Sequence, residues 1–269
     1  MLNFLYTTIP GRLMLKGLTN PKLSDICGRF MDSSFSKFLI PIFVRKNNIN
    51  LSEYHSDNFT CFNDCFSRKV KKDMRPICKD PKALMSPCDG LLSVYHINGR
   101  TVLPVKQSRY TLLRLLRSRK LAEEFSDGLC LVFRLCVDNY HRYCYFDDGI
   151  KGENHFIDGV LHTVRPIALE NGPVFTENCR EFTVMKTRHF GKAIQMEVGA
   201  MLVGKIQNNH GKHRFKRGEE KGCFLYGGST IILLLKKDSA VINESIEKAS
   251  QSGFETRVRM GQRIGKSII

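Results

Sequence analysis

Apolar and polar positions alternate with a helical period in the first 50 residues of the chain. Ile26 and Phe30, for example, lie one helical turn apart, with basic residues close to them. Pro21 and Pro41 are expected to divide this stretch into two or three short helices. A basic amphipathic helix of this kind either lies in the headgroup region of a membrane or packs on its own domain with a solvated basic face. The pattern alone leaves both arrangements open.

Residues 51–85 are polar and irregular, and we expect them to form a connector. From about residue 86 the pattern changes to short apolar runs that Gly, Asp and Asn interrupt, which is typical of strands. Helical spacing returns in 110–121 and in 242–253. The runs expected to form strands are Gly90–Ile97, Leu129–Val137, Ile157–Val164, Ala193–Ile206 and Ser229–Leu235. The pattern predicts an α+β protein, with a helical segment over 1–50 and a mainly β, barrel-like or sandwich-like core over 86–269.

Charge adds a constraint on the partner. Basic residues outnumber acidic ones by 42 to 26, which gives a formal net charge of +16 and favours nucleic acid or an anionic lipid surface. The chain has no zinc-finger spacing, no glycine-rich RNA-binding signature and no long basic run. Its longest apolar stretches, Phe38–Val44 and Ile231–Leu235, are far shorter than the ~20 residues that cross a bilayer. Any membrane contact is therefore expected to be peripheral.

Cysteine and histidine spacing does not indicate a metal site. The ten cysteines contain no pair of C-x-x-C units, so we expect reduced, partly buried thiols. The N-terminus lacks a long apolar run followed by a small-residue cleavage site, so we expect no signal peptide. His210 and His213 are spaced as two ligands of a metal, but no third ligand with clear spacing accompanies them. We interpret both histidines as part of a polar, solvated loop.

The most informative segment is Gly227-Gly228-Ser229-Thr230, which precedes the strongly apolar run 231–235. Two glycines before a serine let the backbone take unusual conformations and let a hydroxyl approach the preceding carbonyl. The apolar strand that follows would hold the serine in a fixed place. Taken alone, the segment is more typical of a glycine turn that enters a buried strand.

Two further segments carry groups that can assist a serine. Asp89 lies in Ser86-Pro87-Cys88-Asp89-Gly90, at a turn before a predicted strand. His141 lies in Asn139-Tyr140-His141-Arg142, at the end of the apolar run 129–137. A serine next to glycines, a histidine and an aspartate are the ingredients of an activated nucleophile.

In order and spacing, these segments resemble the phosphatidylserine decarboxylase family. Gly227–Thr230 matches the family's maturation signal, Ser86–Gly90 matches its SPxDG element, and Asn139–Arg142 resembles its DYHR element. The segment 198–206 resembles the family's VGAxxVGxI strand, and 218–222 resembles the acidic glycine turn before the cut. The resemblance covers nearly the whole chain, and the joint order of the motifs is more specific than any one of them.

The resemblance implies a proenzyme that cuts itself between Gly228 and Ser229. A base would take the Ser229 proton, an N-to-O acyl shift would form an ester, and β-elimination would separate a β chain, 1–228, from an α chain, 229–269. Ser229 would become a pyruvoyl group that forms a Schiff base with phosphatidylserine and accepts the electrons left by CO2. The product would be phosphatidylethanolamine, with no metal or pyridoxal phosphate implied. Asp89 and a histidine would assist self-cleavage, and His141 would assist decarboxylation.

The sequence departs from the family pattern at Cys144. Relatives often carry a second histidine there, three residues after the first and paired with the aspartate for self-cleavage. A thiol has a reference pKa of ~8.5 against ~6.5 for imidazole, and a nearby Asp89 would raise it further. Three alternatives follow: His141 serves both steps, which we favour; His162 supplies the missing imidazole; or Cys144 is a buried bystander. His162 is also typical of a hydrogen-bonded core histidine.

The resemblance further implies a peripheral protein on the cytoplasmic face of a bacterial membrane, with residues 1–50 on anionic lipid. Its partners would be phosphatidylserine and the two chains of the self-cleaved proenzyme; a homodimer is left open. One rival is a cleavage-deficient, peripheral lipid-binding protein of the same fold. Another is a decarboxylase for a different serine-headed anionic lipid, such as an ether lipid. A nucleic-acid-binding domain would explain only the charge.

Overall fold

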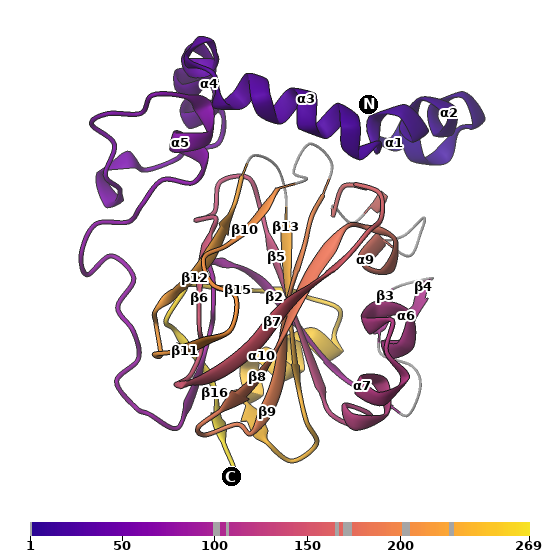
Figure 1. Ribbon diagram of the computed structural model, residues 1–269, viewed down its shortest axis with the longest axis vertical. Helices are drawn as coiled ribbons and strands as arrows, with labels where there is room; N and C mark the ends of the chain where they lie inside the picture. Colours follow the sequence, from indigo (N-terminus) through magenta and orange to yellow (C-terminus); the bar gives the residue numbers. More distant parts are fainter. Residues whose placement is uncertain are drawn as a thin grey trace.

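The computed structural model describes residues 2–98, 103–105, 108–164, 167–168, 174–200, 205–225 and 229–269. An eight-stranded antiparallel sheet lies at its centre, in the order β11-β7-β8-β9-β13-β5-β2-β15 (Figure 1). Two three-stranded sheets, β1-β16-β14 and β10-β12-β6, and the pair β3-β4 accompany it. The strands are β1 (Ala83–Met85), β2 (Gly90–His96), β3 (Leu103–Val105), β4 (Ser108–Tyr110), β5 (Leu129–Leu135), β6 (Arg142–Cys144), β7 (Gly149–Ile157), β8 (Arg180–Thr187), β9 (Lys192–Val198), β10 (Ile206–Asn208), β11 (His213–Phe215), β12 (Glu220–Phe224), β13 (Ser229–Leu235), β14 (Ala240–Ile242), β15 (Thr256–Val258) and β16 (Arg263–Ser267).

Strand β13 is buried on both faces. It pairs with β5 on one side and β9 on the other, and all seven of its residues are buried. Ile231 and Leu233 pack into one hydrophobic core, and Ile232 and Leu234 pack into a second. Side chains alternate between the faces of a strand, so an unbroken apolar run forms a strand only where both faces are covered. The predicted strand 229–235 is confirmed.

The two cores give the molecule its layers. The first core lies between the large sheet and the small sheets, because residues of β1, β6, β12, β14 and β16 contribute to it. The second lies on the opposite face of the large sheet, under residues of α1, α2, α6 and α9. The helices are α1 (Leu2–Thr7), α2 (Ile9–Leu18), α3 (Pro21–Asp32), η1 (Ser34–Phe38), α4 (Leu39–Lys46), η2 (Leu51–Glu53), α5 (Phe62–Phe66), α6 (Leu112–Leu116), α7 (Arg119–Glu124), α9 (Val174–Glu177) and α10 (Glu244–Gln251), of which η1 and η2 are 3-10 helices.

The α+β class is confirmed, but the prediction of a barrel is wrong. Within the described ranges the large sheet stays open, because its edge strands β11 and β15 pair only with β7 and β2, respectively. Each edge strand has only three residues. These two short edges do not pair with each other, so the sheet does not close into a barrel.

Other element boundaries also differ from the sequence prediction, and the strand expected over Ala193–Ile206 ends at Val198 as β9. The helix expected over 110–121 is two short helices, because Arg117 adopts a left-handed conformation with φ of 47° and ends α6. The Ser118 side chain then caps α7 by accepting a hydrogen bond from the Leu121 amide. The strand expected to begin at Ile157 instead ends there, as the last residue of β7.

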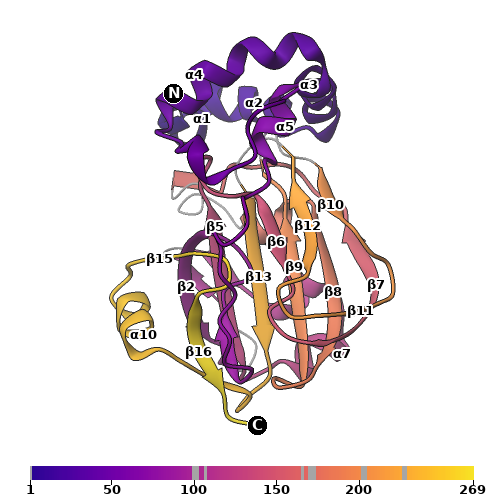
Figure 2. The same cartoon turned by 90° about the vertical axis from the view of Figure 1, so that its left-hand side faces the viewer.

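Helices α1 to α5 form a layer across one end of the sheets (Figure 2). Pro21 divides α2 from α3, as the sequence predicted, and the Asn20 side chain caps α3. Pro41 instead lies inside the first turn of α4, where a missing N–H costs no intrahelical hydrogen bond. Among the described helices, none combines the length and apolar character needed to span a membrane.

A buried ion pair joins the large sheet to the sheet β10-β12-β6. The Lys221 ammonium on β12 lies 2.7 Å from a carboxylate oxygen of Glu197 on β9, and neither side chain is exposed to solvent. Lys221 also donates to Asn208 Oδ1 at 2.7 Å. Burial raises the pKa of the Glu197 carboxyl, and the charge of Lys221 counteracts that rise.

Removing one member of this pair should destabilise the fold strongly. Lys221→Met, made in a Ser229→Ala background to keep the polypeptide in one piece, leaves Glu197 buried and unpaired, and we expect a loss of about 3–5 kcal/mol in the free energy of unfolding. Urea denaturation followed by circular dichroism measures it. The matched control is Lys248→Ala, which breaks the exposed Glu244–Lys248 pair and should cost about 0.3–0.5 kcal/mol. Equal losses in the two variants would contradict the prediction.

Candidate active site

Three neighbouring strands bring the predicted residues Ser229, His141 and Asp89 to one end of the large sheet. Ser229 is the first residue of β13, and Asp89 directly precedes the first residue of β2. Strand β5 runs antiparallel between them and ends at Leu135, and the chain then reaches His141. Arg134 of β5 is opposite both Thr230 and Leu91, so β13 and β2 lie two strand spacings apart, roughly 10 Å.

The Ser229 hydroxyl is buried at the head of β13. The residue has no exposed surface, and its Oγ atom has no hydrogen-bond partner among the described residues. Its backbone is held in register opposite Leu135 of β5. Gly227 and Gly228, the other half of the predicted cleavage site, lie outside the described residues. A buried hydroxyl without a partner is unusual, because its desolvation is not compensated.

The two ring nitrogens of His141 have different surroundings. Its Nδ1 atom lies 2.9 Å from the Asn139 carbonyl oxygen, which can only accept, so Nδ1 carries the proton. The Nε2 atom is buried and has no partner among the described residues. Burial lowers the pKa of His141 to about 3, the Arg68 charge lowers it too, and the bond to Asn139 opposes both. The ring is therefore neutral at physiological pH, with an open lone pair on Nε2.

Two residues of the N-terminal region fix the position of His141, and sequence reasoning had assigned them no role. The Arg68 guanidinium donates to the carbonyls of Asp138 and Asn139 at 2.9 and 3.2 Å. The Phe66 ring lies 4.0 Å, centroid to centroid, from the imidazole. The carbonyls that Arg68 binds are 70 and 71 residues away in the chain. No local pattern distinguishes such an arginine from a solvated one.

Asp89 is held by an arginine rather than by a histidine. Arg75 Nε lies 2.9 Å from Oδ1 of Asp89 and Arg75 Nη2 lies 2.7 Å from Oδ2, which is a two-point contact. The Met260 amide also donates to Oδ1 at 2.8 Å, and Arg75 reaches Glu53 at 2.8 Å. No hydrogen bond or ion pair within the described ranges joins Asp89 to His141. The carboxylate therefore has a fixed position and a paired charge.

A small polar cavity lies beside these groups. Its volume is about 140 Å³, and its lining includes Asp89, Arg75 and Asn139, the residue whose carbonyl holds His141. Arg257 and Arg259 line it as well. Basic and acidic side chains thus surround a space at the same end of the sheet as Ser229.

Comparison with known proteins agrees with this arrangement. The family model described as phosphatidylserine decarboxylase matches residues 62–266. The chain belongs to the phosphatidylserine decarboxylase family. It is 45% identical over 267 residues to phosphatidylserine decarboxylase proenzyme 2 of Clostridium acetobutylicum, which covers 99% of this chain and 91% of the relative. It is 40% identical over 270 residues to the phosphatidylserine decarboxylase proenzyme of Clostridium perfringens, covering 98% and 92% of the two chains.

Cys144 is the position at which this member of the phosphatidylserine decarboxylase family departs from the pattern described above. The residue lies in β6, is buried, and donates its backbone amide to the Pro87 carbonyl at 2.9 Å. Burial raises the pKa of its thiol to about 12, and the nearby Asp89 charge acts in the same direction while Arg217 opposes it. A thiol in this setting stays protonated, which favours the bystander alternative for Cys144.

His162 lies with a different part of the helical layer. Its Nδ1 atom is 3.2 Å from the Tyr6 hydroxyl of α1, and Nε2 is 3.6 Å from Glu177. His141 packs instead on Phe66 of α5, and Figure 1 shows α1 and α5 toward opposite ends of the layer. No hydrogen bond or ion pair within the described ranges joins either histidine to Ser229. The two histidines therefore differ in their surroundings and not in a contact with the serine.

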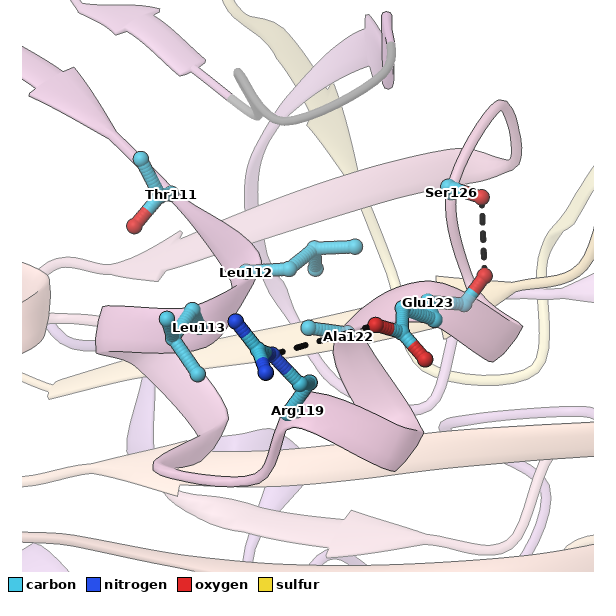
Figure 3. Close-up of a pocket in the computed structure, with 7 residues that line it drawn as sticks. All are labelled: Thr111, Leu112, Leu113, Arg119, Ala122, Glu123 and Ser126. Atoms are coloured by element: carbon cyan, nitrogen blue, oxygen red, sulfur yellow. Dashed lines mark hydrogen bonds and ion pairs between the residues drawn. The ribbon is translucent and has the colours of Figure 1, made fainter.

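A second cavity can be set aside as a candidate site. It has a volume of about 420 Å³ and lies between α6 and α7, where Leu112, Leu113 and Ala122 supply its apolar wall (Figure 3). Its Arg119–Glu123 ion pair is exposed, with the charged atoms 3.9 Å apart. None of the predicted site residues lines it.

The Cys144 thiol should resist alkylation in the folded protein. With a pKa of about 12, roughly one thiol in 10,000 is ionised at pH 8, and burial also blocks the reagent. Iodoacetamide labelling before and after unfolding, followed by peptide mass spectrometry, measures this protection. Cys27 and Cys78, which are partly exposed, serve as internal controls and should react first. Labelling of Cys144 as fast as Cys78 would show that the thiol is available as a base.

Proposed function

We propose that this chain decarboxylates phosphatidylserine to phosphatidylethanolamine after cutting itself between Gly228 and Ser229. The observation that carries the proposal is the buried Ser229 hydroxyl at the head of the central strand, without a partner among the described residues. An unsatisfied buried hydroxyl costs about 1–3 kcal/mol, so a serine without a chemical role is disfavoured there. Family membership and the proenzyme names of the relatives support the same reaction.

In the proposed first step, His141 Nε2 takes the proton from Ser229 Oγ as this oxygen attacks the Gly228 carbonyl carbon. The amide C–N bond breaks, an ester C–O bond forms, and the imidazole passes the proton to the Ser229 nitrogen. His141 is neutral before and after the shift. This suits a buried ring with a pKa of about 3, because a lasting positive charge there would be costly.

The second step separates the chains. Loss of the Ser229 Cα proton breaks the Cβ–Oγ bond, which leaves a carboxylate on Gly228 and dehydroalanine at position 229. Water then replaces the nitrogen, ammonia leaves, and a pyruvoyl group remains at the start of the chain 229–269. This group supplies a ketone that accepts the electron pair released with carbon dioxide. The buried Ser229 side chain, which has no partner among the described residues, is compatible with this group, and in the proposal His141 moves the protons.

We assign Asp89 an electrostatic role in the proposed reaction. Arg75 occupies both carboxylate oxygens, so Asp89 acts through its charge and fixed position rather than by removing the Ser229 proton. The charged lining of the adjacent cavity, with Arg257 and Arg259, suits the anionic phosphate and the zwitterionic serine of the substrate headgroup.

Three variants test the self-cleavage proposal. Intact-mass analysis of the purified wild type should show chains of 228 and 41 residues, since 269 − 228 = 41, with the smaller blocked by pyruvoyl. Ser229→Ala should remain whole and inactive, because the attacking oxygen is gone. His141→Ala should also remain whole, whereas His162→Ala should be cut normally. Circular dichroism controls for folding.

The reverse result, with His162→Ala whole and His141→Ala cut, would transfer the role of base to His162. An uncut but folded wild type would support the cleavage-deficient lipid-binding alternative.

We also propose that the helical layer docks on an anionic membrane at the cytoplasmic face. Among the described side chains of residues 3–46, nine large hydrophobic ones are exposed, including Phe35 at 80% and Phe38 at 63%. Seven basic and two acidic side chains accompany them in residues 1–46. The layer covers the end of the sheet at which β13 begins (Figure 2), so a docked membrane would lie on the side of Ser229.

Removing the exposed aromatic rings should weaken vesicle binding. Phe35→Ser combined with Phe38→Ser should lower partitioning onto phosphatidylserine-containing vesicles by at least about tenfold, since each ring would otherwise be buried in lipid. Binding should also weaken as salt rises. Cosedimentation measures both effects. The matched control is Phe254→Ser, equally exposed at 70% but outside the helical layer. A larger loss in the control would place the docking surface elsewhere.

A further inference from the structure

A cluster of two histidines and one carboxylate lies in the β-rich segment that precedes the cleavage site. His210 follows β10, His213 begins β11, and Glu219 directly precedes β12. One potential ligand atom from each residue lies within 4.8 Å of the other two. The exposed fractions of the three side chains are 30%, 30% and 31%, so the cluster is open to ions from solvent.

Glu219 is the ligand that sequence reasoning did not find. Its Oε1 atom lies 2.6 Å from His213 Nε2 and 3.9 Å from His210 Nε2. The chain returns toward the histidines through a turn in which Gly218 has a φ of 80°, a conformation that favours glycine. Glu219 follows His213 by six residues, a spacing that does not predict the contact between them. The turn at Gly218 creates that contact.

The two imidazole rings lie face to face. They stack with centroids 3.8 Å apart and planes inclined by 10°. Both rings present Nε2 to the same Glu219 oxygen, at 3.9 Å for His210 and 2.6 Å for His213. The donor set therefore has two imidazole nitrogens and one carboxylate.

Outer contacts already orient the ligands. The Tyr145 hydroxyl lies 3.4 Å from His210 Nδ1, which leaves Nε2 of that ring for an ion. Tyr145 is itself fixed by stacking on Phe215, with centroids 4.1 Å apart. The Lys216 amide donates to the second Glu219 oxygen at 2.9 Å, which leaves Oε1 directed at the histidines. Support of this kind is typical of metal sites.

We propose that His210, His213 and Glu219 bind one divalent transition-metal ion of the zinc class, with water completing its coordination. Nitrogen ligands favour zinc, cobalt or nickel over magnesium and calcium. Zinc bonds of about 2.0–2.2 Å require neighbouring ligand atoms to lie about 3.3 Å apart. The observed separations of 2.6 and 3.9 Å lie on either side of that value, so small side-chain rotations suffice.

The positive charges of two nearby lysines, Lys151 and Lys221, disfavour a cation, but their ammonium groups do not occupy its site. The Lys151 ammonium donates to the His210 carbonyl and to Asn154, away from the ring nitrogens. Lys221 is paired with the buried Glu197. Their charges reduce the affinity below that of a four-ligand structural site. The ion would link the loop after β10 to the turn before β12, and β12 leads toward Ser229.

Metal titration of the full chain tests the site directly. Protein prepared without a histidine tag and treated with a chelator should bind one Co²⁺ per chain, seen as visible d–d absorption, and Zn²⁺ should displace it. His213→Asn and Glu219→Gln should each weaken Zn²⁺ binding at least about tenfold in calorimetry. The matched control is His96→Asn, because His96 also contacts a glutamate, Glu247, at 2.6 Å and has no second histidine in its described contacts.

The same titration on Ser229→Ala separates this inference from the proposed function, since the uncut chain keeps all three ligands. Zn²⁺ should raise the melting temperature of the wild type and of His96→Asn more than that of His213→Asn. Metal-free melting temperatures show whether each variant folds. Unchanged Zn²⁺ affinity in folded His213→Asn and Glu219→Gln would overturn the proposal. Intense thiolate-to-cobalt absorption would do the same, because it would assign the ion to cysteines.

Discussion

Strand β13 packs into both hydrophobic cores at once and carries the Ser229 hydroxyl at its head. Hydrogen bonds to β5 and β9 fix its register, and burial of Ile231 to Leu235 on alternate faces prevents it from slipping. A shift by one residue would exchange the side chains of the two cores. Ser229 is therefore held at the head of a strand whose seven residues are all buried, and the proposed self-cleavage would begin from that fixed position.

Two kinds of polar group lie around this strand. Charged groups form ion pairs, and some neutral groups have no described partner. Arg75 and Asp89 neutralise each other, and Lys221 and Glu197 do so in full burial. The Ser229 hydroxyl and the Nε2 atom of His141 are left without described partners at the same end of the sheet. Burial is costly for a lone charge but less so for a neutral imidazole. The same desolvation keeps the Cys144 thiol protonated and the His141 ring neutral.

The helical layer and the strands β10 to β12 place two surfaces around this centre. The layer carries exposed hydrophobic and basic side chains over the end of the sheet where β13 begins. Its helix α5 also reaches inward, since Phe66 packs on the His141 ring. The proposed lipid-binding layer and the His141 ring are thus connected through one short segment. The cluster at Glu219 lies further back along the chain that leads to Ser229.

The sequence by itself determined the α+β class, the strand 229–235 and the N-terminal helices, because these depend on local periodicity and on an apolar run that only burial on both faces explains. Its motif order also indicated the family. The tertiary structure decided the open sheet, the pairing of Asp89 with Arg75, the support of His141 by Arg68, and the arrival of Glu219 beside two histidines. These depend on contacts between residues distant in the chain, or on a turn whose direction no residue spacing encodes.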